Sequence, residues 1–282
     1  MEKAKKRRSW KKGLAITLAV VLFLCAFAFA FAEISFRTAH KWKQWTPDYE
    51  KRDIGEIVQK AQLTEEEYQI LYEQTGLTKL GVDGLREKGL SRRILQIQNA
   101  YFTDYKIERD NFAPYTCIEE IDDQIPNAAL EAGDIVVSDT THVMGFRLGH
   151  AALVLNEYGE TIEAFAIGTD SEIADISAFT TTASFMIFRP IVAAEKRLEV
   201  AKYAQENLVG VPYSFFRGIL TKKFPKSLKN TQCAHIVWYA YKQFGYDLDS
   251  DGRGLVTPQD LANSKHVELV QVYGFNPKKL WK

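Results

Sequence analysis

The sequence predicts an α+β protein in which a helical segment precedes a mainly antiparallel sheet with helices laid on it. Residues 50–108 repeat apolar side chains at helical spacing, whereas short segments rich in Val, Ile and Phe begin near residue 132. Helices followed by a run of strands are typical of α+β proteins. The 282 residues are 46% hydrophobic and 26% charged, an ordinary globular composition.

The first 32 residues are expected to lie outside this fold. "MEKAKKRRSWKKG" carries seven Lys or Arg and one Glu, and residues 14–32 carry no charge. A basic head, an apolar run and small residues at Ala28, Ala30 and Ala32 predict an export signal cleaved after Ala32. An uncleaved membrane anchor is the alternative, because 19 apolar residues nearly span a bilayer. Both interpretations place the remaining chain outside a bacterial cytoplasmic membrane, either secreted or anchored on its outer face.

Residues from Glu33 to about Pro47 are expected to be a linker, and a small helical layer follows over residues 50–108. In "LTEEEYQILYEQTGL", Thr64 and Glu67 have the spacing of a capping box, and Gly76 ends the helix. Without residues 1–32 the chain carries 29 basic and 35 acidic residues, a net charge of −6. This mildly acidic body lacks the basic surface that nucleic-acid binding requires, so no nucleic-acid partner is expected.

The second half alternates strand and helix signals. Strands are predicted for "GDIVVSD", "GHAALVLNE", "ETIEAFA", "SFMIFRP" and "HVELVQVYG", with a tight turn at Gly159. Helices are predicted for "AAEKRLEVAKYAQENLVG", ending at Gly210, for "TQCAHIVWYAYKQF", and for "VTPQDLANS", with Pro258 in its first turn.

Cys233 is the candidate nucleophile. It lies in the first turn of a predicted helix, on the face that carries Ile236, Val237 and Ala240, so it is expected to point toward the protein body. Unpaired N–H groups and the helix dipole at such a position favour a thiolate. The alternatives are a disulfide with Cys117 or an inert packed thiol.

A thiolate nucleophile needs a base and a group that orients the base. His150 opens an apolar strand, and Glu163 lies on the next strand, where a carboxylate is costly unless it is paired. Pairing about the turn at Gly159 predicts that the two side chains are within reach on one face. The alternative for His150 is a core histidine bonded to a backbone carbonyl. His235 follows Cys233 by two residues and is expected on a different helical face.

The segments "GDIVVSD…GHAALVL…TIEAF", "VPYSFF" and "QCAHIVWYAYKQFGYDLD…VTPQDLANS" resemble the circularly permuted NlpC-type cysteine hydrolases of the YiiX/YebB kind. These have a papain-like core in which the His strand precedes the Cys helix, and the resemblance covers about residues 130–265. It implies Cys233 as nucleophile, His150 as general base and Glu163 as the third member. It also implies that Tyr213 helps bind the substrate carbonyl or oxyanion. Ala-His follows Cys233 where relatives often have Ser plus Gly or Glu, but the backbone N–H is the same for any side chain.

Three regions are therefore expected: 1–32, a signal peptide or membrane anchor; 33–128, a linker and helical region; and 129–282, which the resemblance implies is a permuted NlpC/papain-like catalytic domain. The resemblance further implies an exported cysteine peptidase or amidase that cleaves a cell-envelope amide, by resemblance a peptidoglycan peptide, through a thiol acyl-enzyme and without a cofactor. Two alternatives stay open. One is a lipid or thioester acyl-hydrolase on the same core, and the other is a non-catalytic envelope binding protein.

The segment "DLDSDGRG" matches the first half of a calcium-loop pattern. Asp247, Asp249 and Asp251 have the required spacing, but Pro258 stands where the closing acidic ligand belongs. A solvated Asp-rich turn is predicted, with calcium binding as the open alternative. The patterns of serine hydrolases, zinc peptidases and dinucleotide- or nucleotide-binding proteins do not occur in the sequence.

Overall fold

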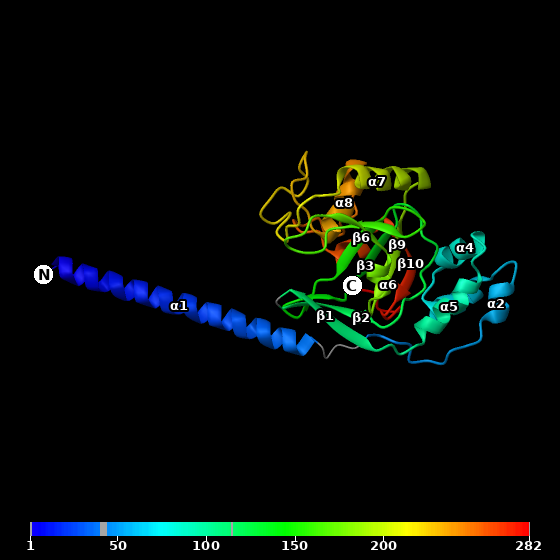
Figure 1. The fold of residues 1–282 in the computed structure, drawn as a ribbon, viewed down its shortest axis with the longest axis horizontal. Helices are drawn as coiled ribbons and strands as arrows, with labels where there is room; N and C mark the ends of the chain where they lie inside the picture. Colours follow the sequence, from blue (N-terminus) through cyan, green and yellow to red (C-terminus); the bar gives the residue numbers. More distant parts are fainter. Residues whose placement is uncertain (1, 40–43, 114, 282) are drawn as a thin grey trace.

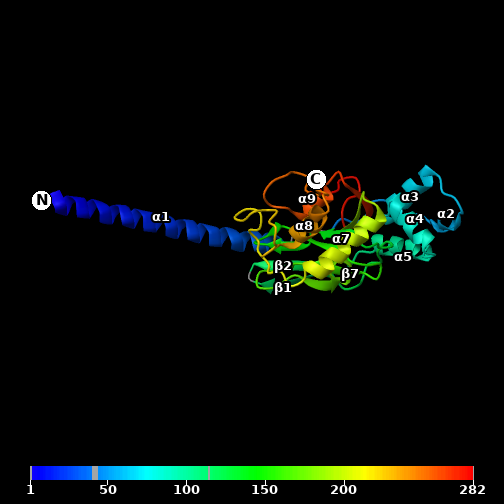
Figure 2. The same cartoon turned by 90° about the horizontal axis from the view of Figure 1, so that it is seen from above.

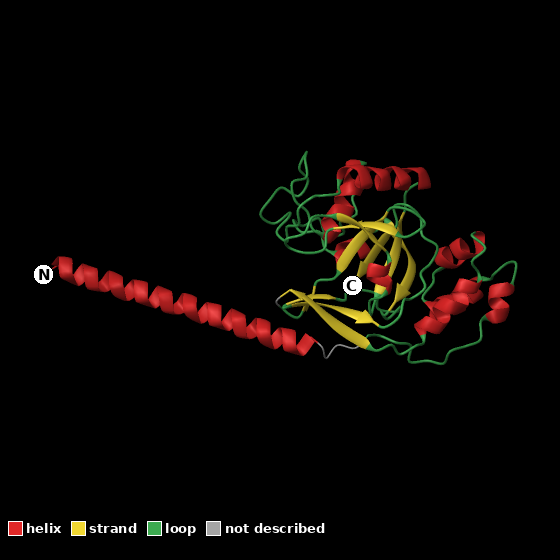
Figure 3. Ribbon diagram, viewed as in Figure 1, coloured by secondary structure: helices red, strands yellow, loops and turns green. Residues whose placement is uncertain are grey.

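The computed structural model describes residues 2–39, 44–113 and 115–281. It is α+β, as predicted, and contains two antiparallel sheets, several short helices and a long N-terminal helix (Figures 1 and 3). Residues 40–43, which belong to the expected linker, lie outside the described residues.

Helix α1 (Glu2–Ala39) projects away from the rest of the chain (Figures 1 and 2). Its segment Lys12–Thr38 is long and apolar enough to cross a membrane, by length and composition. The C-terminal part of α1 contacts the body through aromatic rings: Phe29 and Phe36 each lie 6.0 Å from Tyr115 between ring centroids. The helix therefore continues past Ala32 and ends beside the body.

The expected helical layer consists of α2 (Gly55–Gln59), α3 (Glu65–Thr75), α4 (Lys79–Glu87) and α5 (Arg92–Tyr101). Apolar side chains of this layer, such as Leu71 and Ile94, share one core with Val136 and Ala152 of the larger sheet. The capping box of α3 is confirmed, because the Thr64 hydroxyl accepts from the Glu67 N–H and the Glu67 carboxylate accepts from the Thr64 N–H.

Replacing Thr64 with alanine is expected to lower the free energy of unfolding by about 1 kcal/mol, because an N–H group in the first turn of α3 loses its acceptor. Urea unfolding followed by circular dichroism measures this change. Ser91→Ala is the matched control, since Ser91 precedes α5 without a side-chain capping bond. An equal loss in both variants would contradict the role assigned to Thr64.

The larger sheet has six strands in the order β10-β9-β3-β6-β7-β8, with antiparallel neighbours throughout. All five predicted strands occur in it. Its strands are β3 (Ile135–Ser138), β6 (His150–Val154), β7 (Glu160–Glu163), β8 (Glu172–Asp175), β9 (Phe185–Pro190) and β10 (Val267–Tyr273).

The predicted helices of the second half are α7 (Ala194–Asn207), α8 (Cys233–Gln243) and α9 (Pro258–Ala262). A four-residue helix, α6 (Ser177–Thr180), was not predicted. Helix α7 ends three residues before Gly210, which has a φ of +79° in the following turn. Side chains of α7 and α8, such as Val200 and Val237, pack with Ile135 and Leu153 in a second core on the opposite face of the sheet. The sheet is thus enclosed between two helical layers.

Part of the expected helical region is a β-hairpin, which corrects the prediction for residues 107–121. β1 (Ile107–Ala113) and β2 (Thr116–Ile121) pair with each other, and with β4 (Thr141–Val143) and β5 (Phe146–Arg147) they form a four-stranded sheet in the order β1-β2-β4-β5. Alternate residues of β2 are buried, but one of them, Glu119, is charged, so the strand pattern is weak in the sequence. β2 pairs with β4 across the expected boundary at residue 128.

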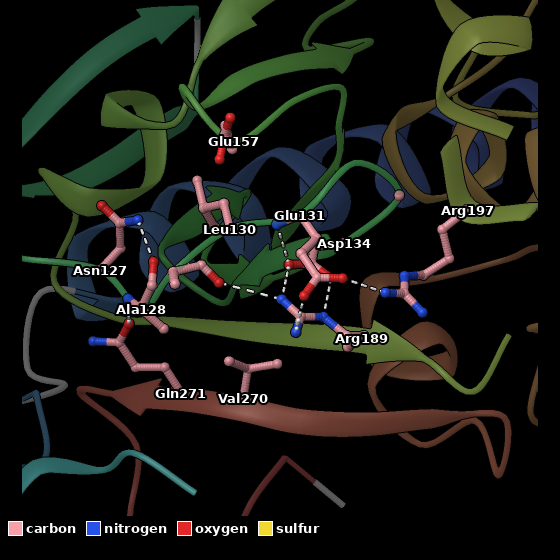
Figure 4. Close-up of polar contacts among 12 residues, drawn as sticks. Asn127, Ala128, Leu130, Glu131, Asp134, Glu157, Arg189, Arg197, Val270 and Gln271 are labelled. Atoms are coloured by element: carbon pink, nitrogen blue, oxygen red, sulfur yellow. Dashed lines mark hydrogen bonds and ion pairs between the residues drawn. The ribbon is translucent and has the colours of Figure 1, made fainter. Parts of the chain in front are cut away.

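A buried ion-pair network joins β3, β9 and α7 (Figure 4). The Arg189 guanidinium donates to both carboxylate oxygens of Asp134 at 2.8 Å, and Asp134 is fully buried. Glu131 pairs with both Arg189 and Arg197. Close by, the Tyr241 hydroxyl of α8 donates to the Gly133 carbonyl at 2.5 Å. The Tyr241 bond joins α8 to the end of the sheet that this network holds.

Candidate active site

Cys233 is the first residue of α8, as predicted. The preceding residue, Gln232, caps the helix: its side-chain oxygen accepts from the Ala234 N–H at 2.9 Å and from the Cys233 thiol at 3.3 Å. The Gln232 amide nitrogen donates to the Val256 carbonyl, which holds the cap in place. Cys233 is 8% exposed, so the thiol is held at the rim of the core by its neighbour.

His150 and Glu163 are brought together on one face of the larger sheet. β6 and β7 pair Leu153 with Ile162, and extending this register places Glu163 diagonally across from His150. The His150 Nε2 and Glu163 Oε2 atoms lie 2.6 Å apart, and both side chains are buried. The alternative of a backbone carbonyl partner for Nε2 is therefore wrong.

Aromatic rings hold the imidazole in position. The His150 ring stacks on Phe179 of α6, with centroids 5.2 Å apart and a 10° interplanar angle. Phe165 meets the same ring edge-on at 5.2 Å and packs in turn on Phe112 of β1. The sequence reasoning missed these contacts because neither α6 nor β1 was predicted.

The imidazole links Glu163 to Cys233. Since Nε2 is bonded to Glu163, Nδ1 is the ring nitrogen left for Cys233, whose sulfur is close enough to raise the pKa of His150. Burial alone would lower the pKa of His150, but the Glu163 charge and the hydrogen bonds to Cys233 and Glu163 outweigh it and raise the pKa above its usual range. The site therefore favours a protonated imidazole beside the sulfur.

Replacing Glu163 with glutamine is expected to move the alkaline limit of activity to lower pH by about 1–3 units. The neutral amide lacks the negative charge that favours the imidazolium form of His150. The sign follows from the raised pKa: the charged ring is present below that pKa and is lost above it. The pH dependence of kcat/KM measures the shift. Glu160→Gln, on the exposed end of the same strand, is the control, and an unchanged alkaline limit in Glu163→Gln would contradict the coupling.

Tyr213 lies beside the start of α8. Its backbone forms a parallel bridge with Thr231, and the Ser214 N–H donates to the Thr231 carbonyl at 2.6 Å. Burial raises the pKa of the Tyr213 hydroxyl, and the proximity of Cys233 raises it further when the sulfur is charged. The phenol therefore keeps its proton and is available as a hydrogen-bond donor near the sulfur.

The other sequence candidates have different surroundings. His235 is fully buried and bonded to Thr231 Oγ1 at 2.9 Å and to the Lys223 carbonyl at 2.8 Å, and burial lowers its pKa to about 4. These partners agree with the prediction that His235 faces away from the sulfur. Cys117, in β2, and Cys233 are both free thiols, so the structure contains no disulfide between them.

The Asp-rich turn brings together a different set of carboxylates from the one that its sequence pattern indicated. Oxygen atoms of Asp249, Asp251 and Asp260 lie within 4.8 Å of one another, and Asp260 lies two residues beyond the position where a closing ligand was sought. Asp249, however, pairs with Lys223, and Asp260 is engaged in the capping box of α9. Interactions with other side chains and backbone groups of the protein thus account for the positions of these two carboxylates.

Comparison of the chain with family models, curated proteins and solved structures finds no match. The site is therefore interpreted from its own geometry. A thiol at a helix start, an imidazole in contact with it and a carboxylate behind the imidazole form the arrangement used for nucleophilic attack on a carbonyl carbon.

Proposed function

We propose that the protein is an exported cysteine hydrolase with a permuted papain-like core of the NlpC type, acting on an amide bond of the cell envelope. The observation that carries this proposal is the buried 2.6 Å contact of His150 with Glu163. The influence of Cys233, the first residue of α8, on the pKa of His150 supports it. The order of the elements supports it, because the His strand β6 precedes the Cys helix α8 in the chain.

In this mechanism His150 Nδ1 takes the thiol proton, and the Cys233 thiolate attacks the amide carbonyl. The N–H groups at the start of α8 that are not bonded to Gln232, together with the Tyr213 hydroxyl, stabilise the oxyanion. His150 then donates its proton to the departing amine, which leaves a thioester on Cys233. His150 next removes a proton from a water molecule, which attacks the thioester and releases the acid. Glu163 keeps the imidazole oriented and favours its charged form throughout.

Helix α1 supports a location outside the cytoplasmic membrane. Its basic head and apolar segment act as an export signal or an anchor, and both direct residues 33–282 outward. Because the sequence around the site resembles the NlpC-type hydrolases, the first candidate substrate is a peptide of peptidoglycan.

A lipid or thioester acyl-hydrolase is the second candidate. It is favoured by the exposed apolar side chains Phe216 and Leu220, which lie in the loop between Tyr213 and Cys233. An acyl chain, unlike a peptidoglycan peptide, is an apolar ligand that such side chains would contact.

Incubation of the purified full chain with peptidoglycan, and separately with acyl esters and acyl thioesters, tests the two candidates. Mass spectrometry detects a new amine and carboxyl end for a cleaved peptide, and the free acid with its alcohol or thiol for a cleaved ester or thioester. Cleavage of peptidoglycan that is lost in Cys233→Ala supports the first candidate, and cleavage confined to acyl substrates supports the second. Failure to cleave any of them, or equal cleavage by the variant, would contradict a cysteine hydrolase and favour a binding protein.

A further inference from the structure

The loop between Tyr213 and Cys233 exposes a cluster of large apolar side chains. Phe216, Ile219, Leu220 and Phe224 are 54%, 53%, 74% and 36% exposed. Single exposed apolar residues are common on protein surfaces, but four within nine residues of one loop are an unusual concentration, and exposed apolar surface of this kind often binds a partner. We call residues 216–224 the apolar loop.

The apolar loop is held in one conformation by buried contacts. Arg217, within the apolar loop, is 4% exposed, and its guanidinium donates to the carbonyls of Asn230 at 2.8 Å and Lys222 at 3.0 Å. Gly218 lies so close to Gly254 that an added Cβ would meet the Gly254 carbonyl oxygen at 1.8 Å. A buried arginine and a close backbone approach thus hold the loop. Phe216, Ile219 and Leu220 are exposed on it, whereas the Phe224 ring also packs on Trp238 and Tyr239 of α8.

The segment that contains the apolar loop carries a charge opposite to that of the body, and one of its basic residues, Lys223, pairs with Asp249. Residues 216–230 contain five basic residues and no acidic one, whereas residues 33–282 carry a net charge of −6. Lys222, Lys226 and Lys229 are exposed. Apolar side chains interspersed with lysines are typical of segments that lie in the interface of an anionic bilayer.

The apolar loop lies at the end of the body from which α1 departs, in both views (Figures 1 and 2). At this end Tyr115 contacts Phe29, and Phe146 contacts Phe31 with centroids 5.9 Å apart. Phe29 and Phe31 belong to the apolar segment of α1, so a membrane that holds this segment meets the same end of the body.

We propose that the apolar loop is a membrane-binding surface for anionic phospholipid. Its apolar side chains enter the boundary between headgroups and acyl chains, and its lysines contact the headgroups. This inference depends on membrane attachment through α1, which is part of the proposed function. Because Tyr213 and Cys233 flank the segment that contains the loop, the contact holds the site beside the membrane surface.

Hydrogen exchange tests this surface in the full chain, reconstituted in lipid nanodiscs of phosphatidylcholine alone or of phosphatidylcholine with phosphatidylglycerol. Amides of residues 216–224 are expected to exchange severalfold more slowly in the anionic discs. The double variant Phe216→Ser, Leu220→Ser is expected to lose this protection. Tyr158→Ser is the matched control: Tyr158 is 84% exposed, next to Glu157, which pairs with Lys88 at the end of α4.

Equal exchange in both discs, or unchanged protection in the double variant, would overturn the proposal. The measurement does not depend on turnover. A protected loop in a protein that cleaves nothing would contradict only the hydrolase, and an active enzyme with an unprotected loop would contradict only the membrane contact.

Discussion

Replacing Cys233 with alanine is expected to reduce hydrolysis by about 10⁴-fold or more, because the nucleophile of a catalytic unit is removed. The variant is expected to stay folded, since Cys233 lies at a helix start and alanine is smaller than cysteine. Steady-state rates on whichever substrate the wild type cleaves, together with circular dichroism, measure both effects.

Cys117→Ala is the control for this prediction. Cys117 is buried in β2 and is also a free thiol, but its charge interactions involve Glu119, Arg109 and Arg147 rather than the residues around Cys233. It is expected to retain wild-type activity. Loss of activity in Cys117→Ala with full activity in Cys233→Ala would reverse the assignment of the nucleophile.

Replacing Asp134 with alanine is expected to lower the free energy of unfolding by about 3 kcal/mol, because the buried Arg189 guanidinium loses its two-point partner and keeps only the partly exposed Glu131. Arg189 is 8% exposed, so water replaces the lost carboxylate poorly. Urea unfolding of the full chain in detergent measures the loss. Since Gly133 and Tyr241 join the same region to α8, the site is expected to lose activity at temperatures where the wild type is stable.

Lys88→Ala is the matched control for Asp134→Ala. Lys88 pairs with Glu157 at 2.7 Å, but 55% of the Glu157 side chain is exposed. An exposed pair contributes only about 0–1 kcal/mol. A similar loss of unfolding free energy in the two variants would contradict the larger contribution assigned to the buried Asp134–Arg189 pair.

The strands that carry the site were predictable from local patterns. β3, β6 and β9 are fully buried and rich in Val, Ile, Ala and Phe, so they form apolar runs between turn residues. The turn at Gly159 leaves few possible registers for β6 and β7, and this is why the pairing of His150 with Glu163 followed from the sequence. The first turn of α8 was recognisable because Cys233 begins an apolar helical pattern.

The rest of the site depends on elements without such patterns. β1 has the sequence "IERDNFA", whose three successive charged residues are unusual in a strand, and its partners come from β2. α6 has only four residues, too few for a helical repeat of apolar positions to be recognised in the sequence. It nevertheless supplies Phe179, whose ring stacks on His150. Gln232 caps α8 although glutamine is outside the group of preferred capping residues. Tertiary packing decides each of these features.

The most direct test of the catalytic arrangement is the rate at which iodoacetamide alkylates Cys233 at pH 6, followed by mass spectrometry of its peptide in the wild type and in His150→Ala. If His150 takes the thiol proton, the wild type should react at least about tenfold faster than the variant, since the thiolate is the reacting form. Removal of the imidazole also widens access to the sulfur, so a slower variant cannot be attributed to shielding. Equal or faster alkylation of His150→Ala would show that the sulfur does not depend on the imidazole, and the hydrolase mechanism would fail.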